Sequence, residues 1–180
     1  RGPFHVVDNF TGMSRAYDSW RNGVLDDDPP ITFRVPSAVD PLLAPVGKAV
    51  LTATVSAVPA RLFDGEWTHE KREGLAALVI AAADRVFPGI LSTILRYEIL
   101  LAPDFDNARG VSFGDLDGGE LSPDQALSHR PFPGWDDGRT PVRGLYLGGP
   151  SNAAAPFFTG LSGFRAASSV ILDIGARRHA

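Results

Sequence analysis

The chain has 180 residues, of which 44% are apolar, and this is sufficient for a folded domain with a hydrophobic core. Its net charge is −4 and its basic runs are no longer than Arg177–Arg178, which excludes the electrostatic pattern of a nucleic-acid-binding protein. The absence of cysteine excludes disulfides and thiol chemistry, and no stretch approaches the roughly 20 apolar residues of a transmembrane helix.

The first part of the chain predicts a helix followed by a loop. Four large apolar residues recur at helical spacing and would form one stripe: Phe10, Met13, Tyr17 and Trp20. Arg15 and Asp18 would lie on the other face. Three aspartates and two prolines then occupy residues 26–30, where charge repulsion and proline predict a solvated loop.

The middle of the chain predicts an antiparallel sheet covered by a helix. Residues 31–35 and 49–58 are strand-like, and the connection between them suits an antiparallel pair. Thr68 is a good N-cap for a long amphipathic helix that ends before Pro88. We expect another strand at residues 94–101, followed by a capped turn at 102–105.

The last third combines a long loop with one strand and one helix. Residues 110–140 lack periodicity and are rich in glycine and proline, with a short helical turn predicted at 122–125. A structureless stretch of this length is usually functional. An apolar strand at 144–147 then ends on small residues, and a glycine-punctuated helix begins near Gly160. These elements predict an α+β fold with a piece of an α/β layer at its end.

The glycines at this end admit two interpretations. Gly149, Gly160 and Gly163 could hold a nucleotide cofactor at a helix N-terminus, or they could let a strand and a helix pack closely. The chain has neither a G-x-S-x-G elbow nor a phosphate-binding P-loop, which leaves hydrolase and NTPase functions without support. His129 lies in the long loop and is a candidate site residue, and no histidine spacing predicts a metal site.

Several segments in chain order carry a resemblance to one family. The chain resembles the C-terminal third of the phytoene desaturase-like flavoproteins, in particular the group called pyridine nucleotide-disulphide oxidoreductase domain-containing protein 2. The segments are 15–18 (RAYD), 36–41 (PSAVDP), 44–48 (APVGK), 119–125 (GELSPDQ), 130–135 (RPFPGW), 140–147 (TPVRGLYL) and 160–167 (GxxGxxAA). Their order and spacing agree over nearly the whole chain.

The resemblance implies a specific division of the chain. Residues 1–140 would belong to a substrate-binding domain, and residues 141–180 would be the last strand and helix of a Rossmann-like FAD-binding domain. The family's GxGxxG half is missing here and would be carried by an N-terminal partner chain. The implied FAD-binding residues are Gly148, Gly149, Pro150, Phe158, Thr159, Gly160, Leu161 and Gly163. Phe157, Phe158 and His129 would line the site of an apolar substrate.

The resemblance implies a flavin-dependent oxidoreductase.

 This chain would oxidise or desaturate its substrate by hydride transfer to FAD, and it would act only together with its partner chain. One departure keeps an alternative open. The family's His-Pro and glycine run is replaced here by residues 152–158, in which alanine, proline and phenylalanine do not give the backbone the freedom of glycine. The alternative is a flavin-free member that binds a hydrophobic ligand or partner, or that catalyses a non-redox isomerisation or cyclisation. No signal peptide is visible, and we expect a cytoplasmic protein.

Overall fold

The computed structural model describes residues 2–7, 9–115, 118–119, 122–125, 127–152 and 159–178. The chain forms two compact units, Arg1–Ala108 and Arg109–Ala180, called here the N-terminal and C-terminal units. This division follows packing within the chain. It does not test the predicted division after residue 140, which assigns segments to the domains of a longer protein. Among the described residues, no helix has the length and apolar character needed to cross a membrane.

A small antiparallel sheet is the frame of the N-terminal unit. Its strands lie in the order β1 (Phe4–Val6), β2 (Ile31–Arg34) and β3 (Thr52–Val55). The central strand pairs with both neighbours, so that Ile31 lies opposite Val6 on one side and Val55 on the other. The predicted antiparallel pairing of segments 31–35 and 49–58 is confirmed, with β3 shorter than predicted.

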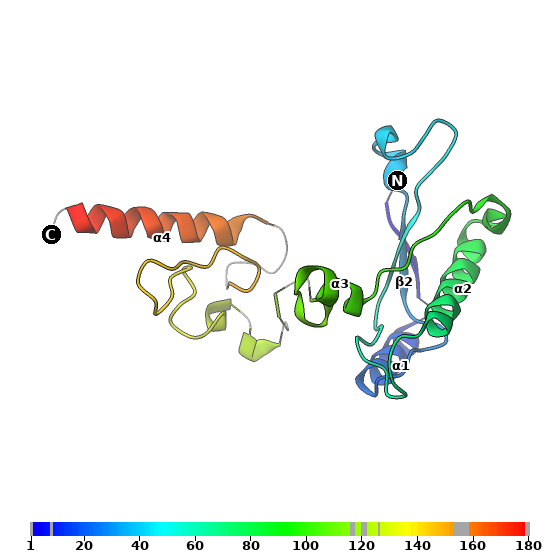
Figure 1. Cartoon of the computed structure of the whole chain (residues 1–180), viewed down its shortest axis with the longest axis horizontal. Helices are drawn as coiled ribbons and strands as arrows, with labels where there is room; N and C mark the ends of the chain where they lie inside the picture. Colours follow the sequence, from blue (N-terminus) through cyan, green and yellow to red (C-terminus); the bar gives the residue numbers. More distant parts are fainter. Residues whose placement is uncertain are drawn as a thin grey trace. The chain divides into compact units, whose positions relative to one another are not determined.

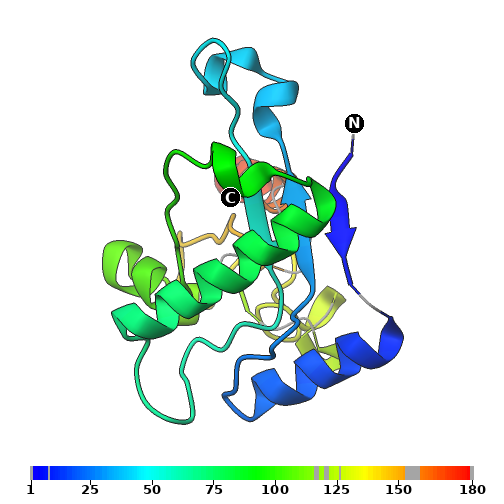
Figure 2. The same ribbon diagram turned by 90° about the vertical axis from the view of Figure 1, so that its right-hand side faces the viewer.

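A long helix, α2 (His69–Val86), covers one face of this sheet (Figures 1 and 2). Ile31 and Phe33 of β2 are buried against Ala82 and Ala83 of the helix. The small alanine side chains let the helix approach the strand, and burial of each large side chain stabilises the unit by about 1.5–3 kcal/mol. The predicted N-cap is confirmed, because the Thr68 hydroxyl accepts a hydrogen bond from the Lys71 N–H at 3.4 Å.

The predicted strand at residues 94–101 is wrong. This segment forms no strand within the described part of the chain, and most of its residues are exposed. Leu101 is buried with Trp67 and Leu75, and Ile99 packs against the same cluster. Only this end of the segment is therefore covered, by α2 and by the indole ring, whereas Leu95 and Leu100 remain exposed.

The predicted turn at residues 102–105 is the beginning of a helix, α3 (Ala102–Arg109). Asp104 fixes its first turn, because one carboxylate oxygen accepts the Leu101 N–H at 2.7 Å. Both carboxylate oxygens also accept hydrogen bonds from the two terminal nitrogens of Arg72, each at 2.8 Å. This two-point ion pair joins α3 to α2 and lowers the pKa of Asp104.

The predicted first helix is confirmed as α1 (Phe10–Arg21), with the Asn9 side chain accepting the Gly12 N–H at 2.9 Å. Its contact with the unit is made by small residues, since Gly12 and Ala16 are buried. The large residues of the predicted stripe are exposed: Phe10, Met13, Tyr17 and Trp20. The stripe is therefore apolar surface of this chain and not part of its core.

The prediction that residues 26–28 are a solvated loop is wrong for Asp26, whose side chain is only 4% exposed. Arg15 donates to the two carboxylate oxygens at 2.9 and 3.0 Å, and the Ser19 hydroxyl and the Asp28 N–H also donate to them. The hydrogen bonds from Arg15 hold the pKa of Asp26 below its ordinary value. The buried carboxylate thereby joins α1 to the loop that leads into β2.

The C-terminal unit consists of α4 (Leu161–Arg178) and a folded loop that contacts it. The predicted strand at 144–147 is wrong, because the described residues provide it with only the isolated bridge between Arg139 and Tyr146. A strand requires a continuous partner, and this unit supplies none for it in the described ranges. The Leu147 N–H instead donates to the Gly138 carbonyl at 2.7 Å and closes the loop.

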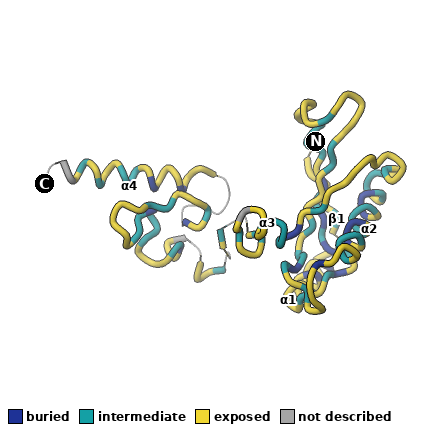
Figure 3. Tube along the Cα trace, viewed as in Figure 1, coloured by how far each residue is buried: buried dark blue, intermediate teal, exposed yellow. Residues whose placement is uncertain are grey.

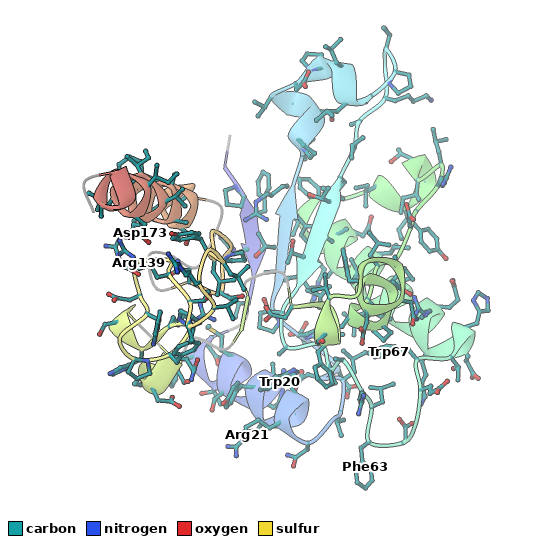
Figure 4. The ribbon with its side chains drawn as sticks, turned by 60° about the vertical axis from the view of Figure 1, so that its left-hand side comes forward. Trp20, Arg21, Phe63, Trp67, Arg139 and Asp173 are labelled. Atoms are coloured by element: carbon teal, nitrogen blue, oxygen red, sulfur yellow. The ribbon has the colours of Figure 1, made fainter. Side chains whose placement is uncertain are left out.

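Arg139 fastens this loop to α4 (Figure 4). Its guanidinium donates to Asp173 at 2.7 Å, to Asp137, and to the Ser169 hydroxyl at 3.2 Å. The Tyr146 hydroxyl donates to the other oxygen of Asp173 at 2.6 Å. The hydrogen bonds to Asp173 and Asp137 raise the pKa of Arg139, so that the guanidinium keeps its charge.

The two sides of α4 differ in the size and polarity of their side chains. The side that contacts the loop carries small or polar residues, including the buried Ser162, Ala166 and Ser169. The large apolar residues of the helix are exposed, as the yellow stretches of α4 in Figure 3 show. They are Leu161, Phe164, Ile171, Leu172 and Ile174. Within this chain, α4 is therefore held by polar contacts and leaves its apolar surface uncovered.

We expect Asp26→Asn to lower the free energy of unfolding at pH 7 by about 2 kcal/mol, because the charged hydrogen bonds with Arg15 are lost. Because the folded pKa is lowered, the contribution of Asp26 is complete above the unfolded value and is lost as the pH falls through the folded value. The difference from wild type should therefore shrink in acid. Urea unfolding at several pH values measures it. Asp27→Asn, at the exposed neighbouring position, is the matched control and should change little.

A pair of glycine variants tests the packing of the loop on α4. Gly138 and Gly144 both have positive φ, so alanine should cost roughly 1–2 kcal/mol of backbone strain at either position. At Gly138 the added Cβ would also lie 2.9 Å from the Ala166 Cα, whereas at Gly144 it would meet nothing within 4 Å. Gly138→Ala should therefore lower the thermal midpoint more than Gly144→Ala does. Equal midpoints in thermal unfolding would contradict this packing.

Candidate functional site

The predicted cofactor residues of the C-terminal unit lie on a loop and on the helix beside it. A Cβ placed on Gly148 would be 3.4 Å from the Gly163 Cα, so loop and helix approach closely where both residues are glycine. Asn152 is fully buried and holds the loop in shape. Its side-chain amide donates to the Leu147 carbonyl at 2.9 Å, and its N–H donates to the Gly149 carbonyl at 3.2 Å.

The beginning of α4 has the electrostatic character that attracts an anionic group. Gly160 adopts a positive φ and its carbonyl accepts the Phe164 N–H at 3.0 Å, which starts the helix. The Thr159 hydroxyl accepts the Leu161 N–H at 3.3 Å. The first N–H groups of any α-helix lack partners within the helix, and the first turn of α4 contains no acidic residue. The helix dipole therefore favours negative charge at this end.

Ser162 is a further candidate site residue, which the sequence pattern did not indicate. It lies in the first turn of α4 and is only 6% exposed, yet its hydroxyl oxygen is buried without a hydrogen-bond partner. A buried hydroxyl without a partner is uncommon in folded proteins and calls for an explanation. The only sequence signal was its place between Leu161 and Gly163, in a helix that already attracted attention for its glycines.

A second loop meets the first one beside Pro150. A Cβ on Gly118 would lie 2.5 Å from the Ser151 nitrogen and 2.7 Å from the Pro150 carbonyl carbon. Gly118 adopts a positive φ, so that both space and backbone conformation require glycine there. The turn formed by Gly118 and Gly119 thus packs directly onto the predicted cofactor loop.

Arg130 reaches this turn and was also missed by the sequence analysis. One terminal nitrogen of its guanidinium, Nη2, donates to the Gly118 carbonyl at 2.9 Å. The residue is only 3% exposed, and the other terminal nitrogen, Nη1, is buried without an acceptor. Its position between His129 and Pro131 in a loop rich in glycine and proline was the available signal.

In the described structure, no contact joins the remaining predicted residues to the loop that contains Gly148, Gly149 and Pro150. His129 is exposed at the end of a short 3-10 turn, Leu127–His129. The short helical turn predicted at 122–125 is present as Pro123–Gln125, where a hydrogen bond from Ser122 lowers the pKa of Asp124. Phe157 and Phe158 lie outside the described residues. Within the described ranges, no cluster of acidic, histidine or cysteine side chains could hold a metal ion.

The N-terminal unit has a shallow hollow on the polar side of α1. Thr11, Ser14, Arg15 and Asp18 line it together with Ser19, Asn22 and Val24. The charge of Arg15 is already engaged by Asp26, so this hollow offers a ligand little that is unsatisfied. The loop and helix start of the C-terminal unit are therefore the better candidate site.

Comparison with known proteins identifies related sequences. Pyridine nucleotide-disulfide oxidoreductase domain-containing protein 2 of Rattus norvegicus is 31% identical over 163 residues, which cover 90% of this chain. The protein of the same name from Mus musculus is 30% identical over the same share. The matched region is 28% of the length of each relative. No family model matches the chain, and no solved structure matches it.

The similarity extends over both units of the chain and was expected from the segments quoted above. It does not test the wider resemblance to phytoene desaturase-like proteins or the placement at a C-terminal end. The similarity supports a relationship of this chain to the family of pyridine nucleotide-disulfide oxidoreductase domain-containing protein 2.

Proposed function

We propose that the chain is the C-terminal part of a flavin-dependent oxidoreductase. The relatives carry the word oxidoreductase in their names, which supports a redox role in general terms. The observation that carries the proposal is the close approach of Gly148 to Gly163 at the start of α4. It brings the predicted cofactor loop to a helix N-terminus, a place that favours negative charge.

The residues at this place fit FAD. The beginning of α4 offers helix N–H groups, and the partnerless hydroxyl of Ser162 lies in the same turn. Gly148, Gly149 and Pro150 would hold the cofactor from the loop, and the stretch from Phe158 to Leu161, with Gly163, would hold it from the helix. When bound, FAD supplies the ability to accept a hydride from a C–H bond of the substrate. The helix N-terminus would stabilise the negative charge of the reduced ring.

The proposed substrate is an apolar small molecule. Phe157 and Phe158 are its proposed contacts, together with His129 at the edge of the same unit. Flavin enzymes leave the chemistry to the cofactor, so a paired acid and base among these side chains is not required. The protein residues would then bind and orient the substrate and exclude water.

The proposed partner is a chain that carries the GxGxxG half of the FAD-binding domain. The outward side of α4 supports this, since Phe164 and Ile171 are each 70% exposed although the helix contacts the loop through small and polar residues. Exposed apolar surface of this kind marks an interaction site. The relatives are also much longer than the region they share with this chain, and their additional length would include such a half.

We expect the protein isolated from its natural source to contain a second polypeptide and FAD. Denaturing mass spectrometry of the purified material detects both components at once, and the absorption spectrum before denaturation checks the flavin. A second polypeptide without flavin would support the alternative, a flavin-free protein that binds a hydrophobic ligand or catalyses a non-redox rearrangement. This chain alone, without flavin, would contradict the proposed function.

We also expect Ile171→Glu to abolish retention of the second polypeptide, because it places a charge in the proposed interface. The isolated chain should keep its thermal midpoint, since Ile171 is exposed in it. Arg165→Glu, at another exposed position of α4, is the control and should retain the partner. Co-purification followed by gel filtration measures retention, and an unchanged complex with Ile171→Glu would place the interface elsewhere.

A further inference from the structure

Only one of the two terminal nitrogens of the Arg130 guanidinium has a hydrogen-bond acceptor. Its Nη2 is held by the Gly118 carbonyl at 2.9 Å, while Nη1 is buried and has no acceptor. The described residues place no carboxylate within ion-pair distance of Arg130. A buried charge without a counter-charge is costly, and proteins pair or coordinate such groups.

Arg139 shows what a structural arginine looks like in the same unit. Its guanidinium contacts two carboxylates, Asp137 and Asp173, and the hydroxyl of Ser169. It is also about one-third exposed, whereas Arg130 is almost completely buried. The better buried of these two arginines is therefore the one to which the described residues offer no carboxylate, the reverse of what folding alone would favour.

We propose that Arg130 and the turn formed by Gly118 and Gly119 bind an oxyanion, with Nη1 donating to a phosphate or carboxylate oxygen. The planar guanidinium is suited to such a group, and the contact of Nη2 with Gly118 fixes its orientation. The turn packs on Pro150 and Ser151, so the anion would lie near this end of the predicted cofactor loop. The proposal requires an oxyanion in this place and does not depend on the proposed function, since the anion could belong to a cofactor or to a substrate.

The burial of Nη1 sets two properties of this site. Shielding from water strengthens a hydrogen bond between a guanidinium and an oxyanion. It also means that the turn must open for the anion to enter.

The test measures binding of oxyanions to the 180-residue chain by calorimetry at constant ionic strength. The probes are inorganic pyrophosphate, FAD compared with riboflavin, and decanoate compared with decanol. We expect wild type to bind at least one oxyanion, and Arg130→Met to weaken that binding by about tenfold or more, because a charge-assisted hydrogen bond is lost. Arg143→Met, which removes an exposed arginine of the same unit, is the control for general charge effects.

A second variant keeps the charge of Arg130 and moves its position. In Gly119→Ala the new Cβ would lie 2.9 Å from Nη2 and displace the guanidinium. Gly134→Ala has the same type of backbone conformation with nothing within 4 Å, and it is the control for strain. We expect Gly119→Ala to weaken binding more than Gly134→Ala does. This comparison decides the question if Arg130→Met fails to fold.

The outcomes separate this site from the proposed function. Binding of pyrophosphate and FAD through Arg130 would identify a cofactor phosphate, and binding of decanoate but not decanol would identify a substrate carboxylate. Binding of decanoate without any binding of FAD would support this site while weakening the flavin proposal. If no oxyanion binds, or if Arg130→Met and Gly119→Ala bind as wild type does, the proposal is overturned, whether or not FAD is found in the protein.

Discussion

The contact between the loop of residues 137–149 and α4 is the constraint on which the candidate site depends. Arg139 supplies its electrostatic part by joining Asp137 on the loop to Asp173 on the helix. Glycine supplies its steric part, because a Cβ on Gly138 would lie 2.9 Å from the Ala166 Cα, and Gly148 approaches Gly163 to within contact distance. The loop can therefore present its backbone at the start of the helix without a continuous sheet beneath it.

This means of attachment explains why the apolar surface of α4 lies outward. The face used within the chain is small and polar, so the hydrophobic effect contributes little to holding the helix in place. The same arrangement occurs on α1, where Gly12 and Ala16 are buried and the aromatic stripe is exposed. In both helices the side chains with the most apolar area to bury are exposed and find no cover among the described residues, which favours a larger assembly.

The sequence was sufficient for the elements that local patterns determine, and insufficient where burial came from another part of the chain. The helices α1 and α2 and the pairing of β2 with β3 follow from periodicity and from caps such as Thr68. Residues 94–101 had the composition of a strand, but Leu101 is covered by Trp67 and α2, which local composition does not report. Asp26 looked solvated for the same reason, since its partner Arg15 lies in the preceding helix.

Within the site, the glycines were visible as a sequence pattern. The buried atoms of Arg130 and Ser162 that lack hydrogen-bond partners were not, because a missing partner depends on what surrounds a side chain in three dimensions.

Among the described residues, these two are the side chains with a buried polar atom that has no hydrogen-bond partner. The hydroxyl of Ser162 and Nη1 of Arg130 are both buried without partners, in the same unit and on the two segments that meet the predicted cofactor loop. Each costs stability in the chain by itself, because water has been removed and nothing has replaced it. A ligand that supplied acceptors would recover that free energy on binding, and it would bind more tightly because the protein had already been desolvated. Unsatisfied polar atoms concentrated beside a single loop are therefore better explained by a binding site than by defects of packing.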